Sequence, residues 1–340
     1  MSSEVRIGPC GQALVFIPMP AMDSLQFSIT DVVDPYNCTS NPATGLTSPT
    51  TGIVSEYRRP QPLANLPFLT SIMWDGREPS LASQASDAVL IHAQSAAPPV
   101  ADQIDQIIQF ESALFAAQTY DNAAGDLTAD GAQGGSVALS AIPFVSNINP
   151  PGPSFNPSTM TMFFNWNNSP DANKASIARG QNIFNEKSFA ITGVAGLNDV
   201  TGKSSIPGTC SACHNTPQVG NHSSSEFLDL GIATAPAAMA GGTSLSLADL
   251  PVFTVHCESG PFAGTDRQVT DLRRALITGQ CADIGKVKTA LLRNLAARPP
   301  YFHNGSAPDL ATVVAFYDDR FQIGLTDQEK ADLVAFLATL

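Results

Sequence analysis

The stretch Cys210-Ser211-Ala212-Cys213-His214 decides how this chain is interpreted. Two thiols one helical turn apart can add to the two vinyl groups of a haem, and the adjacent histidine then faces the iron as an axial ligand. A zinc site usually draws its four ligands from two such pairs, and the sequence has no second pair. A thioredoxin-like dithiol needs a βαβ context, which this region lacks. The motif therefore predicts one covalently bound haem c, held by Cys210, Cys213 and His214.

The composition is that of a globular protein with few charges. Of the 340 residues, 43% are hydrophobic and 14% are charged, whereas about 25% are charged in a typical globular domain. Glycine and proline number 25 and 26, so long irregular loops are expected. These values exclude a disordered chain, a coiled coil and a fibrous repeat.

The charge balance argues against two classes of partner. Seventeen basic and 30 acidic residues give a net charge of −13. Such a surface repels phosphate backbones and anionic lipids, so we expect no nucleic-acid partner. No apolar run approaches the roughly 18 residues that span a bilayer, so no membrane span is expected. The first residues, MSSEVRIG, lack the basic and apolar regions of a signal peptide.

The remaining four cysteines form two pairs that are local in sequence. Cys10 lies near Cys38, and Cys257 lies near Cys281. They could be four buried free thiols or two disulfides, Cys10–Cys38 and Cys257–Cys281. The disulfides agree with the oxidising compartment outside the cytoplasm that covalent haem attachment implies.

The apolar pattern indicates a mainly α chain in two domains. Residues 1–60 are rich in turns and strands. Helices are predicted over 80–94, 101–118, 176–184, 265–277, 310–320 and 327–340. Thr326 and Glu329 form a capping-box pattern at the start of the last of these. The run NINPPGP at 147–153 reads as a linker. We therefore place the two domains at 1–155 and 156–340.

Two further stretches resemble a known family. Residues 292–305, LRNLAARPPYFHNG, resemble the LRN…PYFHxG signature of bacterial di-haem cytochrome c peroxidases and their MauG-type relatives. Residues 73–77, MWDGR, resemble the W-D-G-R segment of the same family. The resemblance covers roughly 57–118 and 178–340. It implies two cytochrome c-like domains, mainly α; in this sequence only the C-terminal one has its own C-x-x-C-H.

The resemblance also implies an activity and its partners. The family's peroxide-linked oxidoreduction and electron transfer are expected here, in the periplasm. The partners would be a small electron-donor protein and a small oxidant such as hydrogen peroxide.

The sixth haem ligand follows only from the resemblance. In the peroxidases it is a methionine fourteen residues beyond the FHxG histidine, and here that count from His303 reaches Tyr317. The MauG-type enzymes have a tyrosine at that place. From the residues alone, Tyr317 is equally an ordinary core tyrosine. The other candidates are His222, His256, His303 and Met239.

Two N-terminal positions match family residues with catalytic roles, and a third could replace a residue that is missing. Trp74 matches the tryptophan that relays electrons between two haems, although it could simply be a core residue. Gln84 matches a residue of the peroxide pocket. The acidic residue that follows in the family is absent, and His92 could take its acid–base role or be structural. Arg59 stands where the family has a calcium-binding asparagine, so calcium is possible but doubtful.

The main departure from the family is a missing haem motif. Residues 1–73 contain no second C-x-x-C-H. Either the chain is a fragment that begins after that motif, or its lineage lost the first haem. Three functions remain open: a redox enzyme of the di-haem peroxidase/MauG type, a single-haem electron-transfer module without catalysis, and a haem-dependent structural or binding subunit.

We predict one haem per chain in protein exported and matured with the haem-attachment machinery. Mass spectrometry should show a single haem adduct on the peptide that contains Cys210 and Cys213. Two adducts would contradict the absence of a second haem, and no adduct would contradict the haem assignment.

Overall fold

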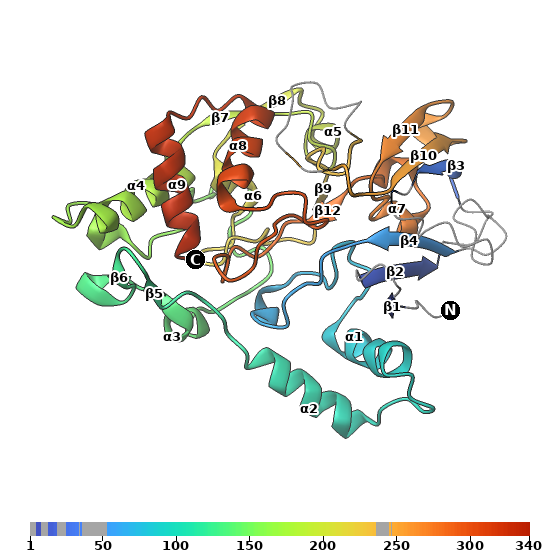
Figure 1. Ribbon diagram of the computed structural model, residues 1–340, viewed down its shortest axis with the longest axis horizontal. Coiled ribbons are helices and arrows are strands. Elements are labelled where there is room, and N and C mark those ends of the chain that lie inside the picture. The colour runs from blue at the N-terminus through green and yellow to red at the C-terminus, as the bar shows by residue number, and fades with distance from the viewer. Residues whose placement is uncertain are drawn as a thin grey trace.

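The computed structural model describes residues 5–7, 13–18, 25–33, 53–235 and 247–340, with positions 35 and 245. Its helices are α1 (Leu81–Asp87), α2 (Ala101–Ser112), α3 (Gly135–Ser140), α4 (Ala172–Glu186), α5 (Asn198–Thr201), α6 (Cys210–Cys213), α7 (Ala275–Thr278), α8 (Leu310–Phe321) and α9 (Asp327–Ala338). Figure 1 shows α4, α6, α8 and α9 grouped together, with α2 at the far end of the molecule.

The strands form small antiparallel sheets among the described residues. They are β1 (Val5–Ile7), β2 (Ala13–Pro18), β3 (Phe27–Val33), β4 (Ile53–Tyr57), β5 (Tyr120–Asp121), β6 (Gly125–Asp126), β7 (Phe189–Thr192), β8 (Ser205–Gly208), β9 (Phe227–Leu228), β10 (Val252–Cys257), β11 (Asp266–Val269) and β12 (Val287–Lys288). The three-stranded sheets have the orders β1-β2-β4 and β11-β10-β3, and β5-β6, β7-β8 and β12-β9 pair in twos.

The prediction of a mainly α fold is wrong, because helices and small sheets share the described chain. The predicted helix over 265–277 is instead strand β11 followed by the four-residue α7. In β10, exposure alternates between half-buried and buried residues, which is the pattern of a strand with one face on a core. Its partner β3 lies far away in sequence, so local periodicity could not reveal the sheet.

The other predicted helices are present with shifted ends. The first is shorter than expected, since α1 stops at Asp87 and one π-helical turn, η3 (Ala88–His92), follows it. The last begins as predicted, with Thr326 accepting a hydrogen bond from the Glu329 backbone and the Glu329 side chain accepting one from Thr326 N. Among the described residues, no helix has the length and apolar character needed to cross a bilayer.

The largest core lies where α4, α8 and α9 meet. Phe184 of α4 packs its ring 5.7 Å from that of Phe336 of α9, and Ile177, Val314 and Leu333 are buried in the same cluster. Gly180 allows the two helices to approach closely, because a Cβ there would lie 2.0 Å from the Asp332 carbonyl oxygen. This core supports α6, which carries the C-x-x-C-H motif and packs Cys210 against it.

A second core lies under the β11-β10-β3 sheet. Phe27 of β3 and Phe253 of β10 are buried in it together with Leu272. The structure joins Cys257 to Cys281 by a disulfide in this core, with their Cα atoms 6.0 Å apart. The predicted Cys10–Cys38 pair lies outside the described residues.

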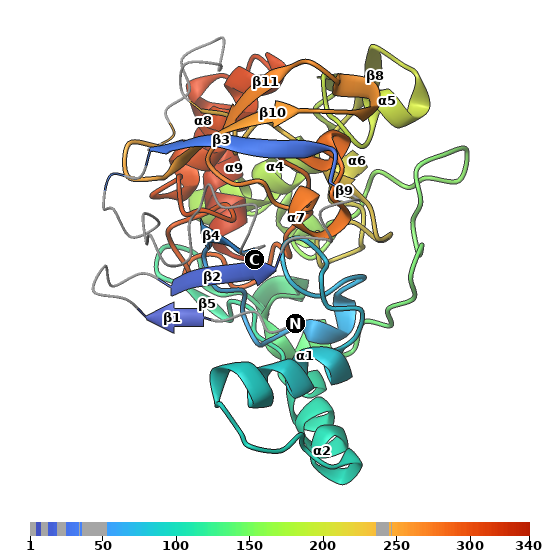
Figure 2. The same ribbon diagram turned by 90° about the vertical axis from the view of Figure 1, so that its right-hand side faces the viewer.

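The N-terminal strands contact the C-terminal half of the chain. β3 pairs antiparallel with β10 from Phe27 opposite Cys257 to Val33 opposite Val252. Figure 2 shows β3, β10 and β11 side by side, with α1 and α2 at the opposite end of the molecule. The division into domains at 1–155 and 156–340 stays a prediction.

The close contact between α4 and α9 predicts a strong effect for Gly180→Ala. The added methyl group would meet backbone atoms of Asp332, which cannot rotate away, so we expect a loss of about 3 kcal/mol in the free energy of unfolding. Urea denaturation measures it. Glu186→Ala, on the exposed end of the same helix, is the control and should change stability by less than about 0.5 kcal/mol. Equal stability of both variants would contradict this packing.

Candidate haem site

The cysteine motif lies on a helix of only four residues. Such a helix is not stable alone, so tertiary contacts must fix it. Ser211, between the two cysteines, is fully buried, and its Oγ donates to Asn185 Oδ1 of α4 at 3.2 Å. The same Oγ lies 3.0 Å from Thr159 Oγ1. These hydrogen bonds of Ser211 hold α6 against α4 and thereby fix the orientation of Cys210 and Cys213.

Both motif cysteines are free thiols that line one cavity. Burial raises the pKa of the Cys210 thiol to about 12, and the Cys213 charge adds to the effect. Burial likewise raises the pKa of Cys213 to about 12. Both are therefore protonated at neutral pH, as S–H groups that can add across a vinyl group.

His214 presents a neutral ring nitrogen to the same cavity. Its Nδ1 hydrogen bonds with the backbone oxygen of Gly220, and because a carbonyl oxygen only accepts, Nδ1 carries the proton. Nε2 is then left with a free lone pair. Burial lowers the pKa of His214 to about 4, against a smaller opposing effect of that hydrogen bond. This is the protonation state that an axial haem ligand needs.

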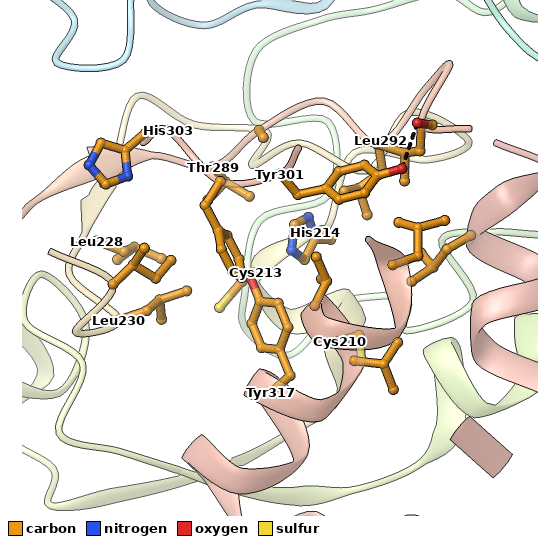
Figure 3. A pocket seen from close by; sticks show the side chains of 18 of the residues that line it. Cys210, Cys213, His214, Leu228, Leu230, Thr289, Leu292, Tyr301, His303 and Tyr317 are labelled. Carbon is orange, nitrogen blue, oxygen red and sulfur yellow. Dashed lines mark hydrogen bonds between the residues drawn. The ribbon is translucent and has the colours of Figure 1, made fainter. Parts of the chain in front are cut away.

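Tyr317 reaches the cavity from α8. Figure 3 shows its ring pointing towards Cys213 and His214. Burial, reinforced by the two nearby thiols, raises the pKa of the Tyr317 phenol above its usual value. Among the described residues no hydrogen-bond partner faces the hydroxyl of this half-buried tyrosine.

The rest of the lining is apolar with a cationic part. The apolar members include Phe184, Ile191, Leu228, Leu230, Phe302, Val313, Leu333 and Leu337. The basic members are Arg59, Arg273, Lys288 and Arg298, and no aspartate or glutamate of the described chain lines the cavity. In a protein of net charge −13 this is a marked concentration of positive charge. An apolar macrocycle with two carboxylates and two vinyl groups fits this lining, so the residues present fit a haem.

Comparison with known proteins points the same way. No family model matches the chain. A cytochrome-c peroxidase of Denitromonas iodatirespirans is 33% identical over 152 residues, which is 38% of this chain and 36% of the relative. A second cytochrome-c peroxidase of that organism is 32% identical over 156 residues, 43% of this chain and 38% of the relative.

The resemblance to the cytochrome c peroxidases is confirmed. The chain matches less than two fifths of the length of these relatives. A solved MauG-like protein associated with microbial copper homeostasis aligns over 84% of this chain and 74% of its own, with 15% identity and a TM-score of 0.43.

Trp74, the residue matched to the peroxidase electron relay, lies at the same cavity. Its Nε1 donates to the Arg59 backbone oxygen at 2.8 Å, and its ring centroid is 6.4 Å from that of His303. The structure thus brings Trp74 together with the cysteine motif and Tyr317. The relay role itself stays a prediction.

Gln84 and His92 are not part of this cavity. Gln84 lies on α1, and His92 is exposed at the end of η3. Their predicted roles in a peroxide pocket stay predictions. Calcium is likewise untested; where the family has an asparagine ligand, the side chain of Arg59 donates to the Arg298 carbonyl.

The alternative axial ligands are engaged elsewhere or not described. His222 is buried and lies 3.3 Å from a Glu226 carboxylate oxygen. His256 pairs with Asp266 across β10 and β11 at 2.6 Å. Met239 is outside the described residues. Of the alternatives that the structure describes, only His303 lines the cavity, and it is held by charged neighbours.

A buried cluster of charged residues, which no sequence motif indicates, lies next to the cavity. Arg58 donates through Nε and Nη2 to the two carboxylate oxygens of Asp271, each at 2.7 Å. Its Nη1 lies 2.5 Å from Asp75 Oδ2. His303 Nε2 is 3.4 Å from Asp271 Oδ2, and Arg273 donates to His303 Nδ1 at 2.9 Å. We refer to these five residues as the buried ion cluster.

The cluster sets the protonation of its members. Burial alone disfavours the Asp271 carboxylate, but the Arg58 guanidinium outweighs it and holds the pKa of Asp271 well below its usual range. Burial, with the positive charge of Arg273, lowers the pKa of His303 to about 3. Burial and the Asp271 charge raise the pKa of nearby Glu56 well above its usual range. His303 is therefore neutral and Asp271 ionised at neutral pH.

The cluster predicts a severe effect for Asp271→Asn. The change leaves the buried Arg58 with one fewer carboxylate partner, which typically costs about 3–5 kcal/mol. Urea unfolding at pH 7 measures the loss, with Asp319→Asn on the exposed side of α8 as the control. Because the native pKa of Asp271 is depressed, its contribution is full above the unfolded pKa of about 3.9 and declines as the pH falls below it. A deficit that disappeared already at pH 6 would contradict this account.

Proposed function

We propose that the chain is a haem c redox protein of the di-haem cytochrome c peroxidase/MauG type. The observation that carries the proposal is the convergence on one cavity of two free thiols, a neutral histidine and a tyrosine whose hydroxyl has no hydrogen-bond partner among the described residues. The curated relatives, all cytochrome-c peroxidases, favour peroxide-linked oxidoreduction over a plain electron carrier. Hydrogen peroxide as oxidant, a small donor protein and a periplasmic location belong to the same proposal.

The residues divide the work between binding and positioning. Cys210 and Cys213 would hold the haem covalently, and the His214 lone pair and the Tyr317 oxygen would face the iron from α6 and α8. When bound, the haem supplies reversible one-electron chemistry. The apolar wall excludes water from it. An anionic tyrosine oxygen favours the oxidised iron more than a thioether does.

Trp74 supplies the route by which electrons reach the cavity in this proposal. Its ring stands at the cavity wall, and its indole N–H is fixed by the Arg59 carbonyl oxygen. Because the Trp74 ring is fixed, its distance to a group bound in the cavity stays constant. A single-haem electron-transfer module remains the alternative, since the chain has one C-x-x-C-H.

Tyr317→Phe tests the ligand set. If the Tyr317 oxygen binds the iron, the ferric absorption spectrum of the variant should change from low-spin to high-spin, and cyanide should bind faster. Absorption spectroscopy with and without cyanide measures both effects.

Tyr301→Phe is the matched control. Tyr301 lines the same cavity, but its hydroxyl donates to the Leu295 carbonyl oxygen at 2.8 Å. Loss of this hydroxyl should leave the ferric absorption spectrum unchanged and lower the free energy of unfolding by about 1 kcal/mol. An unchanged ferric spectrum in Tyr317→Phe would rule out Tyr317 as the ligand.

A further inference from the structure

Two of the four arginine and lysine residues at the cavity have no anionic partner in the part of the chain that the structure describes. Within that part, the Arg59 guanidinium donates only to the backbone oxygen of Arg298. The Arg298 guanidinium makes neither a hydrogen bond nor an ion pair with any described residue. Both side chains are half-buried. Two adjacent guanidinium groups without a carboxylate cost free energy, because their charges repel and each is partly removed from water.

The electrostatics agree with the geometry. Burial lowers the pKa of Arg298 to about 10, and the positive charge of Arg59 lowers it further. Burial also lowers the pKa of Arg59. Neither arginine gains the upward shift that a paired carboxylate produces, as Asp332 does for the exposed Arg179. The pair is thus placed where a negative charge is missing.

The other two basic residues are already engaged. Arg273 donates to His303 and to the Gly285 carbonyl oxygen. Lys288 donates through Nζ to the Ser71 carbonyl oxygen at 2.7 Å. Arg59 and Arg298 therefore hold the guanidinium N–H groups that remain available for a ligand.

The backbone fixes both arginines to one wall of the cavity. Arg59 N donates to the His303 carbonyl oxygen at 2.7 Å, and Arg298 N to the Leu295 carbonyl oxygen at 3.0 Å. Arg298 precedes Tyr301 by three residues, and Figure 3 shows Tyr301 and His303 across the cavity from Tyr317. The backbones of Arg59 and Arg298 are thus both hydrogen bonded to the segment 295–303, and both residues line the cavity.

We propose that Arg59 and Arg298 form a carboxylate-binding subsite that takes the two carboxylate groups of the haem. This inference rests on the proposed function. Guanidinium groups match carboxylates in shape and can donate two parallel hydrogen bonds to each. Thioether bonds at Cys210 and Cys213 anchor the vinyl side of the macrocycle, and the arginine pair anchors its carboxylate side. The two anchors together fix the rotation of the ring beneath His214.

The experiment uses the matured, haem-loaded protein. Arg59→Gln, Arg298→Gln and the double variant are compared with the parent by resonance Raman spectroscopy, in which the propionate-bending band reports hydrogen bonding to the haem carboxylates. Redox potentiometry gives the midpoint potential. Lys203→Gln removes an exposed positive charge that does not line the cavity and serves as the control.

We expect the propionate band of each arginine variant to be shifted relative to that of the parent. The band of the control variant should match that of the parent. A cation near the iron disfavours the more positive oxidised state, so its removal should lower the midpoint potential. For the double variant we expect at least a tenfold rise in the ratio of oxidised to reduced haem at a fixed potential. This corresponds to a fall of about 59 mV in the midpoint potential. Arg59→Lys keeps the positive charge, so its midpoint potential should stay close to that of the parent. Its propionate band should still shift.

Three outcomes would overturn the inference. An unchanged band and potential in the double variant, with the haem adduct present, would refute the subsite alone. Inorganic phosphate could instead change the midpoint potential of the parent but not that of the double variant, while the propionate band is the same in both proteins. The arginine pair would then bind free anions and not the haem carboxylates. If the parent protein carried no haem adduct, the proposed function would fail, and the subsite with it. Because the Arg298 side chain makes no hydrogen bond within the described protein, Arg298→Gln tests the inference even if the double variant does not fold.

Discussion

The paired hydrogen bonds between Arg58 and Asp271 are the constraint on which the site depends. Both side chains are almost completely buried, and a charge in that environment is tolerated only with a well-placed opposite charge. The pairing joins segments 213 residues apart in sequence. Through Asp75 it holds the loop that carries Trp74, and through His303 it holds the wall opposite the thiols. The cavity exists in its present shape because these segments cannot separate without exposing unpaired charges to an apolar interior.

Sequence reasoning succeeded where the determining signal is local. The spacing of Cys210, Cys213 and His214 is set within one helical turn, and the structure directs all three to one cavity. The capping box at Thr326 is likewise a signal four residues long, and α9 begins there. Tyr317 came from a family pattern and not from its own chemistry; the structure places it in the cavity but does not test its bond to iron.

The features that sequence reasoning missed depend on contacts between distant segments. Nothing around Asp271 indicates that its partner is Arg58, because burial and pairing are properties of the folded chain. The strand β10 has a clear alternating pattern, yet its partner β3 could be identified only in three dimensions. The same limit explains why the sequence does not predict that four basic side chains from separate segments line one cavity in so acidic a protein.

The pairing of β3 with β10 also has a consequence for the order of events in folding. Ser28 Oγ donates to Glu258 across this sheet from a position 230 residues earlier. A chain made from its N-terminus must carry β3 unpaired until β10, which ends at Cys257 of the 340 residues, has been made. Contacts of such long sequence separation slow folding. Meanwhile β3 presents an open strand edge to other chains. The molecule therefore passes through an interval in which association with a chaperone competes with aggregation, and the interval ends only when β10 arrives.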